Sequence, residues 1–89
     1  MPPKLPNRTL VRCACSLTLK ALRHKTGITQ EKLAFEANID RGYMGGLERG
    51  LHSPGIETIY KLLPILGITF VQFADQYEKC LQRARRESN

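Results

Sequence analysis

Helix start and stop signals follow one another so closely in this chain that they leave room for little except short helices. Gly27 stands where a left-handed C-terminal cap is wanted, and Thr29, two residues later, is a typical N-cap. Asn38 tolerates a positive φ and so can end a helix, Asp40 is a strong N-cap, and Gly50 marks another helix end. These signals predict two short helices in direct succession, one after Thr29 and one after Asp40.

Apolar residues at helical spacing predict three longer helices around this central pair. The first begins near Thr9 and carries apolar residues on two sides, which indicates that it packs on two sides. The fourth runs from about Ile56 to Leu66 with Pro64 inside it, and the fifth starts near Thr69. No segment has the alternating pattern of a convincing strand.

The predicted fold class is therefore all-α, a compact five-helix domain over residues 9–85. A chain of 89 residues is long enough for one small domain only. Residues 1–8 contain three prolines and are expected to form a flexible arm. Residues 86–89 are polar and are expected to be a frayed tail.

The charge of the chain favours nucleic acid as a partner. It carries 14 Lys or Arg against 8 Asp or Glu, and residues 1–28 hold six of the bases and no acid. A basic balance of this kind fits DNA, although the same charge would also serve solubility alone. No apolar run approaches the roughly 18 residues that span a bilayer, and no clean signal peptide is present. We therefore expect a cytoplasmic protein with no membrane partner.

Residues that could carry catalysis or bind a metal are poorly placed for either role. Cys13, Cys15 and Cys80 form one Cys-x-Cys pair with no second cluster, and His24 and His52 lie at no recognisable ligand spacing. No pair of carboxylates, nucleophile with a base, or phosphate-binding glycine loop stands at a working spacing. We expect no catalytic residue, no metal and no cofactor, and hence no enzyme.

Two short helices joined by a tight turn are the geometry of the helix-turn-helix, whose second helix enters the DNA major groove. The stretch "TQEKLAFEANIDRGYMGGLERG", with "LRHKTGITQEKLA" at its start and "SPGIETIYKLLPILGI" after it, closely resembles the Cro/C1-type (XRE) helix-turn-helix family. The resemblance covers about residues 19–73 and implies a lambda-repressor-like DNA-binding domain. The run "IDRGYMGGLERG" is most similar to controller proteins of restriction-modification systems. The resemblance implies a transcriptional regulator that binds double-stranded DNA at a palindromic operator as a homodimer.

Three glycines share one face of the third helix, Gly42, Gly45 and Gly46, and Arg49 lies on the same face. The apolar residues of this helix point the opposite way, into the core. The resemblance turns the glycine face toward DNA, so the helix backbone could approach the groove closely. The alternative is a degenerate helix that binds weakly.

Arg41 lies in the first turn of the third helix, where the helix macrodipole disfavours a cation. A residue that is locally unfavourable and gains no evident local contact in return often has a functional role. The resemblance places base reading at this position, and arginine fits guanine O6 and N7 with two hydrogen bonds. A solvated surface arginine is the alternative.

Further DNA contacts are implied by the resemblance. Gln30 matches a phosphate clamp, and Tyr43 is expected at the DNA backbone, with a partly buried packing role as its alternative. His52 could reach a base or phosphate or could simply be solvated. The full set of expected DNA-binding residues is Gln30, Arg41, Gly42, Tyr43, Gly46, Arg49, His52 and Ser53. Arg23 and Glu48 match a pair expected to form a structural salt bridge.

The apolar stripe of the fifth helix is the expected dimer interface, formed by Phe70, Phe73, Tyr77 and Leu81. The same stripe would also serve packing inside the monomer, against the first helix. Phe35, on a helix side expected to face solvent, is a second candidate for the interface.

A function of another class stays open on the sequence alone. In it, the chain is an antitoxin-type module that neutralises a partner toxin and binds DNA secondarily. RNA polymerase is a further candidate partner, because an activator would need an acidic patch and Glu31 and Glu36 of the second helix could supply one.

Overall fold

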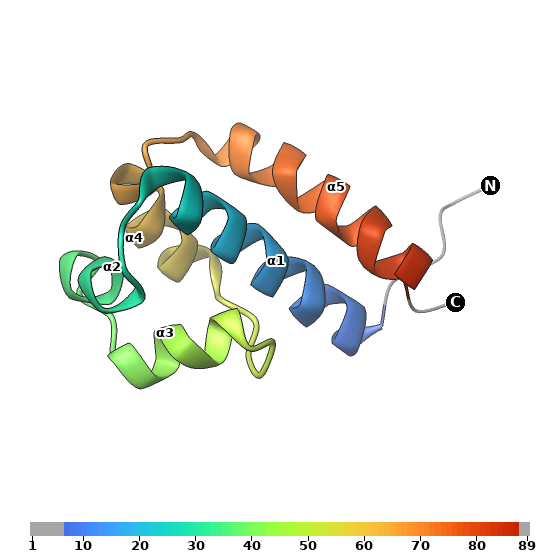
Figure 1. Ribbon diagram of the computed structural model, residues 1–89, viewed down its shortest axis with the longest axis horizontal. Helices are drawn as coiled ribbons and strands as arrows, with labels where there is room; N and C mark the ends of the chain where they lie inside the picture. The colour runs from blue at the N-terminus through green and yellow to red at the C-terminus, as the bar shows by residue number, and fades with distance from the viewer. Residues whose placement is uncertain (1–6, 88–89) are drawn as a thin grey trace.

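The chain folds into five helices in the computed structural model, which describes residues 7–87 (Figure 1). The helices are α1 (Arg8–Thr26), α2 (Gln30–Glu36), α3 (Arg41–Glu48), α4 (Ile56–Leu66) and α5 (Phe70–Glu87). No strand occurs in this part of the chain, which confirms the predicted all-α, five-helix fold. The predicted arm lies outside the described residues, apart from Asn7 and Arg8, which cap and open α1.

The predicted caps of the central helices are present. The side chain of Thr29 accepts a backbone N–H of α2 at 3.1 Å, and that of Asp40 accepts one of α3 at 3.0 Å. Gly27 ends α1 with a φ of 74°, and Asn38 takes a φ of 55° between α2 and α3. Local side-chain chemistry therefore sets where these short helices begin and end.

α5 is longer than the sequence predicted. Thr69 and Gln72 open it with a reciprocal capping box, in which each side chain accepts the backbone N–H of the other at 3.2 and 2.9 Å. The helix then runs to Glu87, so residues 86 and 87, expected in a frayed tail, are helical. An ion pair between Arg83 and Glu87, 3.2 Å apart, spans the last turn. The predicted domain end at residue 85 is therefore two residues early.

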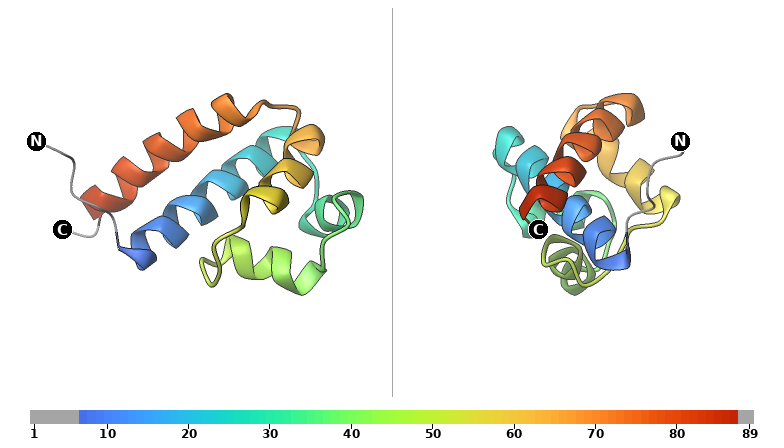
Figure 2. Two further views of the ribbon diagram at one scale, coloured as in Figure 1. Left: turned by 180° about the vertical axis from the view of Figure 1, so that it is seen from behind. Right: turned by 90° about the vertical axis from the view of Figure 1, so that its right-hand side faces the viewer.

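α1 is the central helix of the domain. α5 lies antiparallel along one side of it, and α3 packs on another side, as Figures 1 and 2 show. α2 and α4 lie near the C-terminal end of α1 and close the core there. The largest fully buried apolar side chains are Leu19, Leu33, Met44, Leu47 and Leu62. α2 and α3 thus share one core with α1 and α4, which fixes their positions.

Within residues 7–87, no single helix is long and apolar enough to cross a membrane. α4 and α5 reach that length and apolar content only when taken together, across a bend of 104°.

The apolar stripe of α5 faces α1 in the same protomer. Phe73 is 4% exposed and Leu81 is 8% exposed, and both belong to clusters that include residues of α1. Tyr77 is half-buried between these clusters, and its burial raises the pKa of the phenol. The prediction that Phe73 and Leu81 contact a second protomer is therefore wrong, because their partners lie inside the chain. Among residues 7–87, the exposed large apolar residues are Phe35, Leu51, Ile56, Tyr60 and Val71.

Two of the three cysteines, Cys15 and Cys80, are buried, and all three are free thiols. Burial raises the pKa of Cys15 to about 11, so very little of it is thiolate near neutral pH. We expect iodoacetamide at about pH 8 to alkylate the partly exposed Cys13 in the folded protein and to spare the other two. All three should react in urea, and peptide mass spectrometry would locate the adducts. Rapid alkylation of Cys15 in the folded protein would contradict the packing of α1 on α5.

Candidate nucleic-acid interface

α2 and α3 are joined by the short turn 37–40 and packed on one core. The N–H of Ile39 donates to the carbonyl of Ala34 at 2.9 Å, which closes the turn. Leu33 of α2 and Met44 and Leu47 of α3 are fully buried in the same cluster. This is the helix-turn-helix arrangement, and it leaves the side of α3 opposite these residues on the outside of the fold.

Glu48 joins three helices at the base of this arrangement. Its carboxylate is 2% exposed and accepts hydrogen bonds from Arg23 Nε at 2.7 Å and Nη2 at 3.0 Å. The same carboxylate accepts the side-chain amide of Gln30 at 3.2 Å. The hydrogen bond to Glu48 raises the pKa of Arg23, so the guanidinium stays charged. The predicted salt bridge is thereby confirmed, and the amide of Gln30, a predicted phosphate clamp, is held at the same point.

The glycine face of α3 is not bare, in contrast to our expectation. Gly45 and Gly46 are buried, and polar side chains cover them. A Cβ on Gly46 would lie 2.6 Å from Cδ2 of His52, and one on Gly45 would lie 3.1 Å from Nη1 of Arg49 and 3.4 Å from Oε1 of Gln30. The two glycines therefore make room for side chains, and only Gly42 is exposed as predicted.

His52 makes the closest approach to the surface formed by Gly45 and Gly46, which we call the glycine seat. Its ring lies against Gly46 and also stacks on Tyr43, with ring centroids 5.5 Å apart and planes 24° apart. Four predicted DNA contacts, Gln30, Tyr43, Arg49 and His52, thus gather on one face of α3. The helical spacing of Gly45 and Arg49 could have revealed part of this arrangement. The contact of His52 crosses a loop, and no sequence periodicity marks it.

The N-terminal end of α3 presents the other predicted contacts. Arg41 and Gly42 are exposed there, and Arg41 forms no ion pair within residues 7–87. The neighbouring carboxylate of Asp40 accepts the backbone N–H of Tyr43. Ser53 is exposed in the loop that follows α3. Arg41 is therefore free to reach a ligand in front of α3.

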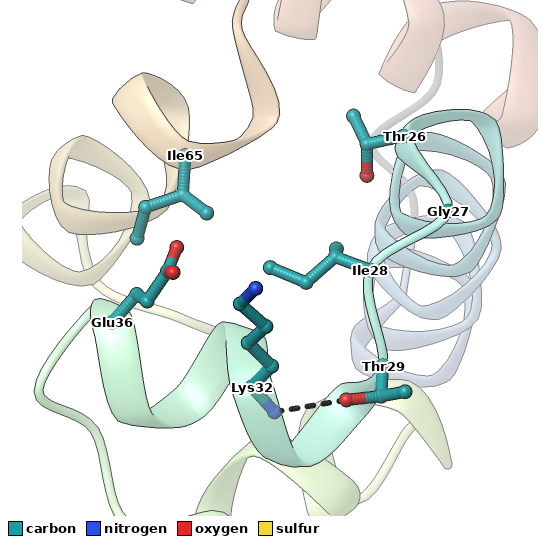
Figure 3. Close-up of a pocket in the computed structure, with 7 residues that line it drawn as sticks. All are labelled: Thr26, Gly27, Ile28, Thr29, Lys32, Glu36 and Ile65. Carbon is teal, nitrogen blue, oxygen red and sulfur yellow. Dashed lines mark hydrogen bonds between the residues drawn. The ribbon is translucent and has the colours of Figure 1, made fainter.

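A separate hollow lies on the far side of α2 from this face, between the α1–α2 turn and α4 (Figure 3). Lys32 and Glu36 of α2, together with Ile28 and Ile65, line its cavity of about 350 Å³. None of the predicted DNA contacts belongs to its lining.

Replacing Gly46 with alanine tests the seat for His52. The new methyl group would overlap the imidazole, so the ring must leave Tyr43. The gain in helix propensity is up to about 1 kcal/mol, so we expect the free energy of unfolding to change by less than that. The readout is the ring-proton NMR shifts of His52, which should move toward those of a solvated histidine. Gly45→Ala is the matched control, since it meets only a flexible guanidinium and amide. Unchanged His52 ring-proton shifts in Gly46→Ala would contradict the contact between the His52 ring and Gly46.

Comparison with known proteins agrees with this geometry. A family model described as HTH_3, helix-turn-helix, matches residues 19–73. The control protein C.BamHI of Bacillus amyloliquefaciens is 39% identical over 44 residues, 49% of this chain and 54% of that protein. An uncharacterized HTH-type transcriptional regulator, y4dJ of Sinorhizobium fredii, is 35% identical over 51 residues, 57% of this chain and 66% of that protein. Both matches span less than two thirds of the relative's length.

A solved structure extends the similarity to the whole fold. The restriction-modification controller protein C.Esp1396I, as a tetramer in complex with its natural 35 base-pair operator, aligns with a TM-score of 0.74 and 29% identity. The alignment covers 81% of this chain and 95% of that chain. The resemblance to restriction-modification controllers inferred from the sequence is thereby confirmed. With its family model matched over residues 19–73, this chain belongs to the helix-turn-helix family of Cro/C1 type.

Proposed function

We propose that this protein is a sequence-specific transcriptional regulator, which binds a palindromic operator in the cytoplasm as a homodimer. The observation that carries the proposal is the charge of α3. Its one acid, Glu48, is buried and paired with Arg23, while Arg41 and Arg49 stay exposed. From Asp40 to Arg49, the exposed charges are thus two arginines against one carboxylate, that of Asp40, which caps the helix by accepting the N–H of Tyr43, and this excess of cations suits the phosphate-lined major groove.

In this proposal Arg41 reads a base, and the side chains that lie over Gly45 and Gly46 position the protein on the DNA. Arg41 would bind guanine O6 and N7 from the first turn of α3. Tyr43, Arg49 and His52 would contact the DNA backbone or a flanking base, and such contacts set orientation and register. Gly42 offers no side chain, so direct readout rests mainly on Arg41 and the remaining specificity on DNA shape.

Dimerisation in this proposal uses an apolar patch on α4 and α5, which we define as Ile56, Tyr60, Phe70 and Val71. Tyr60 stacks on Phe70 with ring centroids 5.5 Å apart and planes 4° apart, and Tyr60 is still 55% exposed. Val71, the next residue after Phe70, is 77% exposed. A second copy of this patch would cover these apolar surfaces and pair two recognition helices on adjacent half-sites.

The pair Val71→Asp and Phe35→Asp tests which surface dimerises. Both residues are exposed apolar side chains on separate helices, so neither change should unfold the protein. We expect Val71→Asp to weaken self-association at least tenfold in sedimentation equilibrium, because a buried unpaired carboxylate costs about 1.4 kcal/mol or more. Operator binding should weaken with it, while Phe35→Asp stays dimeric. If only Phe35→Asp dissociated the dimer, the interface would lie on α2 instead of on α4 and α5. A wild-type protein that binds its operator as a monomer would contradict the proposed homodimer.

A role as a restriction-modification controller is the narrower form of this proposal, supported by the similarity to two such proteins. The packing of α5 along α1 argues against the antitoxin alternative, which predicts a fifth helix that needs a partner to fold. If the protein activates transcription, Glu31 and Glu36 are its candidate contacts with RNA polymerase, because both are exposed on α2.

A further inference from the structure

The N-terminal half of α1 carries two arginines that the proposed interface on α3 does not use. Arg8 and Arg12 lie one helical turn apart, and α1 contains no Asp or Glu along its whole length. Neither arginine forms an ion pair with any residue in the range 7–87. Arg8 also lies in the first turn, where the helix macrodipole opposes a cation. The local structure thus gains nothing from these charges.

The stripe of α1 that bears these arginines is the one that packs on α3. Ser16 on this stripe donates its hydroxyl to the carbonyl of Glu48, and a Cβ on Gly50 would lie 3.8 Å from the carbonyl oxygen of Arg12. Arg12 and Arg8 precede Ser16 by one and two turns, so they continue the stripe past the C-terminal end of α3. Figure 1 shows α1 extending beyond α3 and its following loop in this direction.

Arg12 is partly built into this surface. Its Nε atom is buried, and no hydrogen-bond partner for it lies among the described residues. A buried guanidinium nitrogen without a partner is costly, and an anion held by the same guanidinium would offset part of that cost. The side chain of Arg12 is therefore partly buried, and it belongs to the stripe of α1 that packs beside α3.

We propose that Arg8 and Arg12 form a phosphate clamp that grips the DNA backbone beside the groove occupied by α3. This inference rests on the proposed function and adds a second contact surface to it. One turn of helix separates the arginines by about 6 Å of rise, and each DNA strand carries one phosphate per about 3.4 Å of duplex axis, so the two side chains can reach neighbouring phosphates of one strand. The clamp adds affinity and fixes the position of α3, and it reads no base.

Salt dependence of binding measures the clamp directly. Each phosphate contact contributes about 0.9 to the slope of log K against log salt, so removing two contacts per protomer should flatten the slope by about 3.6 for a dimer. We expect this loss in Arg8→Gln/Arg12→Gln on both the selected operator and a scrambled duplex. The ratio of the affinity for the operator to the affinity for the scrambled duplex should stay the same as in the wild-type protein. Arg8→Gln alone, at an exposed site, should lose about half as much.

The control is Arg83→Gln/Arg86→Gln, which removes the same charge from α5, on another side of α1 than α3, and also breaks the exposed ion pair between Arg83 and Glu87. Leu81 and Ala84 face the interior, whereas Arg83 and Arg86 are exposed on the outer face of α5. We expect this control to change the slope by less than about one unit.

Three outcomes would overturn the clamp. One is an unchanged slope in Arg8→Gln, another is an equal loss in the α5 control, and the third is a loss confined to the operator. If the wild-type protein shows no preference for any sequence, the proposed function fails. The slope on scrambled DNA still decides the clamp in that case, and circular dichroism would check that each variant is folded.

Discussion

Glu48→Ala lowers the free energy of unfolding by about 3 kcal/mol, the largest stability effect that we expect from one substitution in this chain. The carboxylate is almost fully buried and accepts three hydrogen bonds, two from Arg23 and one from Gln30. Its loss leaves a charged and largely covered guanidinium without an anion, and it unties α3 from α1 and α2. Urea denaturation followed by circular dichroism would measure the change.

Two companion variants make the Glu48 prediction specific. Glu78→Ala removes an exposed acid from α5 and should change the stability by less than about 0.5 kcal/mol. Arg23→Leu/Glu48→Leu removes both charges together, and it should cost less than Glu48→Ala because no unpaired ion remains. A Glu48→Ala protein as stable as the Glu78→Ala control would contradict the role of Glu48 as a junction of three helices.

Arg41→Ala is expected to produce the largest change in DNA specificity. The guanidinium is exposed at the start of α3 and unpaired within the described residues, so its loss costs no folded-state contact. Removing a cation from the first turn of a helix should leave stability equal or slightly higher. Discrimination should fall by about 1–3 kcal/mol at one base pair in each half-site, with the symmetric position affected equally.

Competition binding with single-base variants of the operator would measure this loss. Arg41→Lys should not restore the preference, because lysine cannot form the two parallel hydrogen bonds that guanine accepts. Arg86→Ala on α5 is the control for a general loss of positive charge. If Arg41→Ala weakened binding to all duplexes by the same factor, Arg41 would be a phosphate contact and the reader would lie elsewhere.

The parts of the fold that the sequence predicted well are those set by local chemistry. Thr29 and Asp40 have short side chains whose oxygen atoms accept the backbone N–H three residues further on, so the helix starts could be located from the residue types alone. The Arg23–Glu48 pair was also predicted, although through family resemblance rather than spacing. Asn7 was missed as the cap of α1, because the prolines before it indicated an extended arm.

The parts that the sequence could not predict depend on which surfaces meet. An apolar stripe shows that one face of α5 is buried. It does not show whether α1 or a second protomer buries it, because both would need the same spacing of apolar residues. The structure covers Phe73 and Leu81 with α1, whereas Tyr60 and Val71 are among the large apolar side chains that stay exposed. The glycine face was misjudged for a similar reason: its cover includes His52, which reaches back across the loop after α3.

Selection of bound duplexes from a random-sequence pool by the purified protein would show whether α3 reads a DNA sequence. We expect a palindrome whose two half-sites are centred about one helical turn, roughly 10 base pairs, apart. A guanine should recur at one symmetric position, where Arg41 reads it. Recovery of no common sequence, with binding that depends only on salt, would contradict the assignment of α3 as a sequence-reading helix.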